Sequence, residues 1–140
     1  MPVSPEIAWV VSDQIGHAYA RLLNATQSHI EGEEVRVPEF VAMVILTNFP
    51  EGITQTTWGT YQGVSRQRAH VIAKKLVAQR LVEVERVGRG SRVRLTADGH
   101  ALISQLQPAV SAHLASLLAP LSQQEAETLS SLLSRVLPLP

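Results

Sequence analysis

The fold is decided by residues 63–96, which read GVSRQRAHVIAKKLVAQRLVEVERVGRGSRVRLT. This stretch carries nine Lys and Arg residues against two Glu residues, a net charge of +7, although the whole chain is neutral with 12 Lys+Arg and 12 Asp+Glu. The remaining residues therefore carry −7. A local concentration of positive charge is what a polyanion-binding surface requires.

The stretch divides into a helix and a β-hairpin. Ser65 is a good N-cap and begins a helix that we expect to end near Gln79. Leu81–Glu85 and Arg92–Leu95 then alternate with period two, which is typical of strands. Between them, Val87-Gly88-Arg89-Gly90 forms the predicted hairpin tip.

A second short helix precedes this one. Thr54 can cap a helix over about 55–62, with Trp58 as its apolar anchor in the core. Gly63 follows as a residue that tolerates the left-handed conformation at a helix end. Two short helices joined by a tight turn that contains glycine predict a helix-turn-helix, and the hairpin adds a wing.

Long helices are predicted on both sides of this unit. Ser4-Pro5-Glu6 starts a helix that runs to about Ile30, roughly 39 Å, which is longer than the core of so small a domain needs. A further helix begins at Val37-Pro38. After the hairpin, Thr96 caps a helix in which Pro108 predicts a kink, and a capping box, Ser122 with Glu125, starts a last helix that Pro138 should end.

The predicted fold class is mainly α with a small β-hairpin, a winged helix-turn-helix with long terminal dimerisation helices. We expect one domain over residues 1–140, with the winged DNA-binding lobe at 35–96 and the dimerisation helices at 4–30 and 97–137. The terminal helices are apolar along one face and need a partner, which a second copy of the chain would supply as a homodimer.

The polar face of the fourth helix has the chemistry of a recognition helix. Arg66 can bind guanine and Gln67 adenine through the major groove, and Ser65 at the helix N-terminus can hold a phosphate. At the wing tip, two glycines flank Arg89, whose guanidinium could enter a narrow minor groove. The full set of candidate DNA-binding residues is Ser65, Arg66, Gln67, Arg68, His70, Lys74, Arg89 and Arg92. The alternative is a solvated basic face without a partner.

These residues resemble the MarR family of winged-helix transcriptional regulators, and the similarity extends over nearly the whole chain. It rests on Gly63-Val64-Ser65-Arg66, Leu76, Leu81-Val82-Glu83 and Leu95-Thr96-Ala97-Asp98-Gly99. The resemblance implies a homodimer on a pseudo-palindromic double-stranded DNA operator. It also implies a fourth helix that reads the major groove, a wing arginine at Arg89 and control by a small-molecule effector.

The chain departs from the family pattern at several positions. Val87 stands where the family usually has an Asp that braces the wing arginine, and the wing is shorter than usual. Arg80 replaces the Gly that commonly ends the recognition helix, which predicts a different helix end. Gln62 and Trp58-Gly59 also differ from the usual third helix.

Other kinds of site have little support. The chain has no cysteine, and its five histidines form no metal-binding spacing, so we expect no metal, no cofactor and no catalytic residues. Trp9, His17, Tyr19 and Arg21 on the first helix could line an effector pocket, or they could pack in the dimer.

We expect a cytoplasmic protein with no signal peptide or membrane span. The competing functional hypothesis is a winged-helix module that binds an acidic protein partner through its basic face. A monomer that is indifferent to DNA would favour it.

Overall fold

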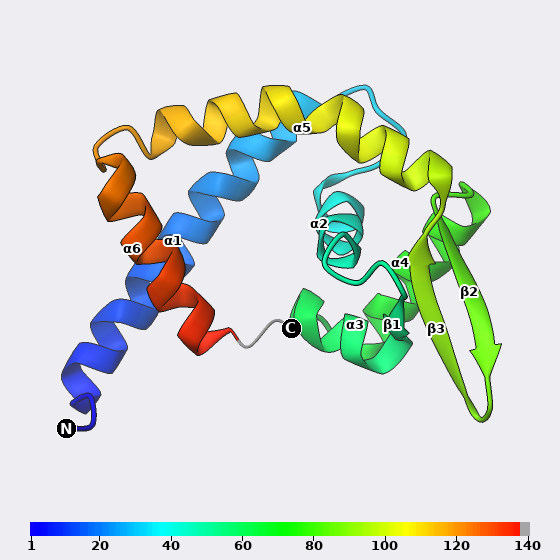
Figure 1. Cartoon of the computed structure of the whole chain (residues 1–140), viewed down its shortest axis with the longest axis horizontal. Helices are drawn as coiled ribbons and strands as arrows, with labels where there is room; N and C mark the ends of the chain where they lie inside the picture. Colours follow the sequence, from blue (N-terminus) through cyan, green and yellow to red (C-terminus); the bar gives the residue numbers. More distant parts are fainter. Residues whose placement is uncertain (138–140) are drawn as a thin grey trace.

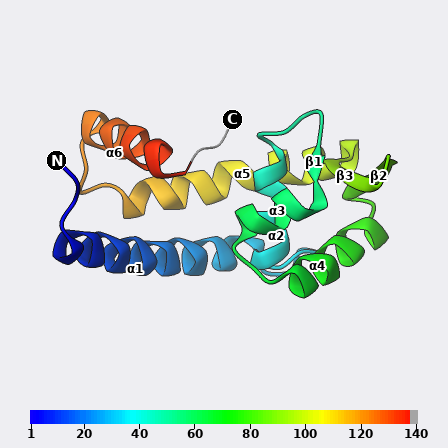
Figure 2. The same cartoon turned by 90° about the horizontal axis from the view of Figure 1, so that it is seen from below.

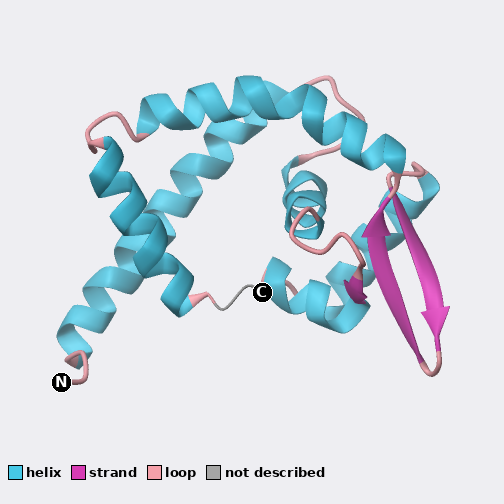
Figure 3. Ribbon diagram, in the orientation of Figure 1, coloured by secondary structure: helices cyan, strands magenta, loops and turns pink. Residues whose placement is uncertain are grey.

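The helix boundaries follow the capping residues of the sequence. In the computed structural model, which describes residues 1–137, Ser4, Thr54, Ser65, Thr96 and Ser122 each accept a hydrogen bond from the backbone N–H three residues ahead. The capping box between Ser122 and Glu125 is confirmed. The elements, shown in Figures 1 and 3, are α1 (Pro5–Ile30), α2 (Val37–Leu46), β1 (Ile53–Thr54), α3 (Gln55–Gln62), α4 (Arg66–Ala78), β2 (Val82–Val87), β3 (Gly90–Leu95), α5 (Ala97–Leu117) and α6 (Gln123–Val136).

The sheet is small and antiparallel, in the order β1-β3-β2. The hairpin register pairs Val82 with Leu95 and Val87 with Gly90, so its strands are longer than the alternating pattern predicts. Sequence analysis did not predict β1, which pairs Ile53 with Val93. This third strand attaches the wing to the start of α3.

The core of the winged lobe lies between α2, α3, α4 and the sheet. Trp58 on α3 is fully buried, as expected of the anchor residue, and its indole Nε1 donates a hydrogen bond to the Ala42 carbonyl of α2 at 2.8 Å. Met43, Leu76 and Val93 are also fully buried and belong to the same apolar cluster. The lobe is thus held by a continuous apolar core, in which the polar N–H group of Trp58 has a hydrogen-bond acceptor.

The end of α4 is a Schellman motif built on a non-glycine residue. Arg80 has φ 61°, in the left-handed region. Its N–H donates to the Val77 carbonyl at 3.0 Å, and the Leu81 N–H donates to the Leu76 carbonyl at 3.0 Å. This is the backbone pattern that a glycine usually provides, so the prediction of a differently built helix end was wrong. The Arg80 carbonyl also accepts a hydrogen bond from Thr96 Oγ1 at 2.7 Å.

The outer helices extend away from the winged lobe. The C-terminal end of α1 packs on α5, whereas α6 overlaps α1 in Figure 1 but is separated from it in Figure 2, where α5 lies between them. The α5 helix is continuous through Pro108 and follows an arc in Figure 1, so the proline bends the helix without ending it. The α6 helix ends at Val136, and Pro138 lies outside the described residues.

Candidate nucleic-acid interface

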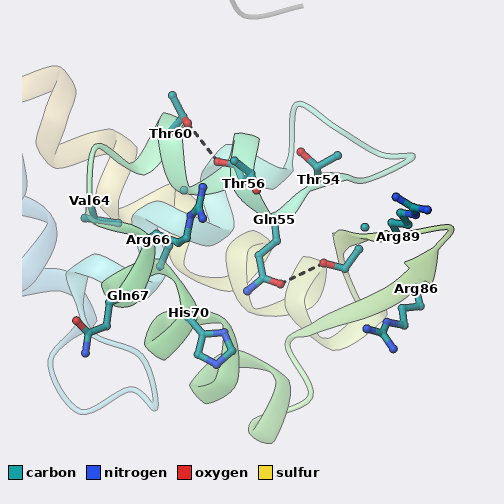
Figure 4. Close-up of a pocket in the computed structure, with 14 residues that line it drawn as sticks. Thr54, Gln55, Thr56, Thr60, Val64, Arg66, Gln67, His70, Arg86 and Arg89 are labelled. Atoms are coloured by element: carbon teal, nitrogen blue, oxygen red, sulfur yellow. Dashed lines mark hydrogen bonds between the residues drawn. The ribbon is translucent and has the colours of Figure 1, made fainter.

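A groove of about 1070 Å³ lies between α3, the start of α4 and the wing. Figure 4 shows Arg66, Gln67 and His70 on the α4 side, with Arg86 and Arg89 on the wing side. Four of the eight predicted DNA-binding residues therefore line one concave surface: Arg66, Gln67, His70 and Arg89. Three of the nine Lys and Arg residues that the sequence concentrates in residues 63–96 line this groove: Arg66, Arg86 and Arg89.

The first turn of α4 presents its polar residues to solvent because its apolar residues face the core. Ser65 accepts the N–H of Arg68 at 3.2 Å and so fixes where the helix begins. Residues Ala69, Ile72, Ala73 and Leu76 are buried, whereas Arg66, Gln67, Arg68, His70 and Lys74 are exposed. The predicted polar face of α4 is exposed and four residues of the predicted core face are buried, but Val77, which was also expected on the core face, is 43% exposed.

The wing carries Arg89 at the tip of a two-residue turn. Gly88 has φ 60° at the first position of this turn, where a side chain would be strained, and Arg89 takes the second position. The wing is tied to α3 close to its tip, because Ser91 Oγ donates a hydrogen bond to Gln55 Oε1 at 3.2 Å. The position of Arg89 relative to α4 is therefore set by a paired sheet and a side-chain contact.

Three basic residues of residues 63–96 make polar contacts with other residues of the same chain. Lys75 Nζ lies 2.9 Å from Glu39 Oε1 on α2, and Arg94 Nε lies 2.6 Å from Glu83 Oε1 on the neighbouring strand. Arg92, one of the predicted DNA-binding residues, donates from its guanidinium to the carbonyls of Glu51 and Gly52 at 3.3 and 3.4 Å. Arg92 thus holds the loop before β1, whatever else it contacts.

The Glu39 carboxylate has a perturbed pKa. Burial raises the pKa, but the hydrogen bond and charge of Lys75, together with backbone donors at the start of α2, outweigh that effect and leave the pKa below its ordinary value. Glu39 is 8% exposed, so this ion pair between α2 and α4 is partly shielded from water. It fixes the core side of α4 while the opposite side stays free of partners.

Sequence analysis missed some residues of the groove. Arg86 from β2 lines it, as do Thr54 of β1 and the α3 residues Gln55, Thr56 and Thr60. The short polar residues of α3 have no motif that distinguishes them from ordinary helix surface. They are recognised only because α3 folds back beside the wing, which depends on the unpredicted β1.

The four effector-pocket candidates are not brought together within one chain. All four are exposed on α1, and none of them lines the groove beside α4: Trp9, His17, Tyr19 and Arg21. At about 100° per residue, Tyr19 and Arg21 point to nearly opposite sides of the helix. His17 Nδ1 lies 3.4 Å from Asp13 Oδ2 one turn away.

Residues 1–137 contain no cluster of three or more His, Asp or Glu side chains arranged to hold a metal ion. None of the helices in this range has the length and apolar character needed to span a membrane.

Comparison with known proteins identifies the fold through structures alone. No family model matches the chain, and no curated protein matches it. A MarR-family transcriptional regulator from Rhodococcus sp. RHA1 superimposes with a TM-score of 0.81 at 15% identity, covering 95% of this chain and 96% of that one. The apo form of MarR from E. coli gives 0.73 at 20% identity, with 99% and 100% covered.

A third structure concerns regulation. BpsR from Bordetella bronchiseptica, described in terms of regulation of its DNA binding by 6-hydroxynicotinic acid, gives a TM-score of 0.74 at 21% identity, with 90% of this chain and 97% of that chain covered. The similarity includes both the winged lobe and the outer helices, since nearly full lengths are matched in each case. The chain has the winged-helix fold of the MarR-family transcriptional regulators.

Proposed function

We propose that this chain is a homodimeric, sequence-specific DNA-binding transcriptional regulator. The observation that carries the proposal is the basic groove, in which a recognition helix and a wing tip converge on one face of a chain with no net charge. Since the remaining residues carry a compensating negative charge, the electrostatic field favours approach of a polyanion by this face alone.

The start of α4 would enter the major groove. Arg66 and Gln67 are exposed in its first turn and have the donor geometry to read guanine and adenine edges, respectively. Ser65, Arg68, His70 and Lys74 surround them and would contact phosphates or flank the bases, which orients the helix without specifying sequence.

The wing would contact the neighbouring minor groove through Arg89. Its turn is narrow because Gly88 and Gly90 add no bulk beside the guanidinium. Arg86 lies on the same groove and would add a phosphate contact, and Arg92 would contribute mainly long-range charge because its guanidinium already donates to two carbonyls.

A second copy of the chain would cover the outer helices. The first half of α1 exposes large apolar side chains, and no residue of α6 from 123 to 136 is buried. In a monomer the apolar face of such an amphipathic helix would stay exposed to water, which is unfavourable. A partner with an apolar surface is therefore required to bury it. A two-fold dimer supplies that partner and presents two recognition helices to half-sites about one helical turn apart. The exposed apolar residues are Ile7, Val10, Val11, Ile15, Leu129, Leu132 and Val136.

The proposal includes release by a small-molecule effector in the cytoplasm. Its support is the fold shared with BpsR, whose DNA binding is described as regulated by 6-hydroxynicotinic acid. In a dimer, Trp9, His17, Tyr19 and Arg21 could approach residues of the second protomer, which a single chain does not allow.

Titration of fluorescent duplexes tests the proposal. We expect enrichment of a pseudo-palindromic sequence from a random duplex pool, with affinity that falls steeply as salt rises, because several phosphates are neutralised. Sedimentation velocity of the free protein should give a dimer. A monomer that binds no duplex at low salt would contradict the proposal and favour an acidic protein partner instead.

A further inference from the structure

The recognition helix exposes two large apolar side chains, Val71 and Val77, and Val71 lies in the middle of its polar face. Val71 is 60% exposed, which is the largest exposed fraction of any large apolar side chain between residues 35 and 96. Its neighbours on the helix surface are Gln67, His70, Lys74 and Lys75, so it forms an apolar island within a basic and polar surface.

The position of Val71 is opposite to the core. Gln67, Val71, Lys74 and Ala78 follow the i, i+4, i+7, i+11 spacing that places side chains along one line of a helix. The buried residues of α4, which are Ala69, Ile72, Ala73 and Leu76, occupy the other side. Val71 therefore lies along the centre of the outward surface, in line with Gln67, while Arg66 and His70 lie to the side that faces the wing.

The proposed dimer interface would not bury Val71. The exposed apolar residues of α1 and α6 lie at the opposite end of the molecule from α4, as both Figure 1 and Figure 2 show. A β-branched residue at a solvated helix position also lowers helix propensity relative to Ala, Lys or Gln, so the position gains nothing for the isolated helix.

We propose that Val71 is a specificity-determining residue that contacts the C5-methyl group of a thymine in the major groove. This inference rests on the proposed function. The thymine methyl is the one apolar group that the major-groove edges of the four bases present, and an apolar side chain discriminates it from a base without the methyl. Valine has a single favoured χ1 rotamer in a helix, so its methyl groups are held in place before DNA binds.

The helix geometry locates the thymine. Val71 lies four residues after Gln67, about 6 Å along the helix axis. Successive bases of one DNA strand are about 3.4 Å apart, so two side chains with this spacing read positions within two base pairs of each other. Each half-site should therefore contain an adenine read by Gln67 and, within two base pairs, a thymine read by Val71.

Removal of a single methyl group from the DNA tests this assignment. The probe is the duplex that the wild-type protein selects from a random pool, synthesised with deoxyuridine in place of one thymine at a time. We expect one substitution in each half-site to weaken wild-type binding about four-fold, the loss expected for one buried methyl group. The sensitive thymine should lie within two base pairs of the adenine at which Gln67→Ala relaxes the selected sequence.

Protein variants tested on the same two probes complete a double-mutant cycle between Val71 and the thymine methyl group. Val71→Ala should bind the thymine and deoxyuridine probes equally, and Val71→Thr, which keeps the branched shape but replaces one methyl with a hydroxyl, should show a reduced difference. Val84→Ala is the matched control, because Val84 is an exposed valine on β2, and it should keep the four-fold difference.

The outcomes separate the two proposals. If a sequence is selected but every deoxyuridine probe binds as well as its parent, or if wild type and Val71→Ala lose affinity equally, the role of Val71 is overturned while the DNA-binding function stands. A selected half-site without thymine overturns it as well. If no sequence is enriched, the regulator function itself is overturned, and the thymine contact with it.

Discussion

Lys75 Nζ on the recognition helix lies 2.9 Å from Glu39 Oε1 on α2, although 36 residues separate the two in the chain. The contact joins α4 to the lobe core on the side away from the groove. It also removes Lys75 from the set of cations available to DNA, which leaves the neighbouring Lys74 exposed for that role.

Replacement Glu39→Gln should make the protein less sensitive to acid. The folded pKa of Glu39 is below its ordinary value of 4.5, so the carboxylate stabilises the folded state fully above pH 4.5 and loses this effect as the pH falls through the folded pKa. At pH 7 we expect the variant to be less stable by about 1–2 kcal/mol, because Lys75 loses its charged acceptor and is itself partly exposed.

Urea denaturation at pH 7 and at pH 3.5 measures this difference. The gap between wild type and Glu39→Gln should narrow at the lower pH. Glu33→Gln, in the exposed loop after α1, is the control and should leave stability unchanged at both values. A gap of constant size across this range would contradict the role of the carboxylate charge.

Replacement Arg80→Gly should stabilise the protein. Arg80 has φ 61°, a conformation that costs a residue with a Cβ atom about 1–2 kcal/mol relative to glycine. Part of this gain is offset because glycine is more flexible in the unfolded chain, so we expect about 1 kcal/mol in the free energy of unfolding. Arg80→Ala is the control, since alanine keeps the Cβ atom, and it should show no comparable gain. Equal stability of the two variants would exclude relief of backbone strain as the cause.

Replacement Gly99→Ala should strongly destabilise the protein. A Cβ atom at this position would lie 2.1 Å from the Leu81 carbonyl oxygen, which is backbone and cannot rotate away. The first turn of α5 would have to separate from the end of α4, at a cost of about 3 kcal/mol or more. Thermal unfolding measures the loss, and Ala101→Gly in the next turn supplies the size of the helix-propensity effect alone, about 1 kcal/mol. A loss no larger than that of the control would disprove the close contact.

Replacement Arg89→Ala should weaken binding to many DNA sequences and reduce the slope of log affinity against log salt by about 1, because one phosphate-neutralising contact is lost. Arg66→Ala should instead relax sequence preference at one base pair. Arg94→Ala is the matched control on the wing, because the Arg94 guanidinium is paired with Glu83 at 2.6 Å. If Arg94→Ala reduced the slope as much as Arg89→Ala, the wing charges would act only as a diffuse field.

Replacement Leu132→Asp should convert the proposed dimer into a monomer without unfolding the protomer. Leu132 is 50% exposed on α6, so a charge there disturbs little within one chain but would be buried without a partner in the dimer. Sedimentation velocity and circular dichroism measure the two effects. Ser131→Asp places the same charge on the opposite side of α6 and should leave the dimer intact. Dissociation by both variants would indicate general repulsion rather than burial of Leu132.

Local signals in the sequence predicted most of the fold. Each predicted N-cap hydroxyl accepts a backbone N–H, and α1, α3, α4, α5 and α6 begin where those caps predict. The α2 helix has Arg36 at its N-cap and no side-chain cap. The strand β1 was missed because two residues are too few for any period to appear. The left-handed Arg80 was also missed, since propensity opposes it. Its two Schellman backbone hydrogen bonds, the packing of Leu81 and the hydrogen bond from Thr96 hold it there.

The candidate site was less accessible to sequence reasoning. Nine cations fall within residues 63–96, but two of them have partners elsewhere in the chain: Lys75 reaches Glu39, and Arg92 reaches the carbonyls of Glu51 and Gly52. Such long-range pairs have no signature in a local window. Val77 was expected on the core face of α4, but the packed helix leaves it 43% exposed.

The two-residue turn at the wing tip lowers the conformational entropy that would be lost when Arg89 binds DNA as proposed. The flanking residues Val87 and Gly90 are already paired in the sheet, so the backbone around the guanidinium is ordered before binding. A longer, mobile wing would lose about 1–2 kcal/mol of backbone entropy for each residue that became fixed. This wing loses mainly the rotamer freedom of one arginine side chain, about 2 kcal/mol. The short wing is preorganised, so the complex would form with a smaller entropic penalty. Because it also reaches less far, it would fit a narrower range of groove geometries.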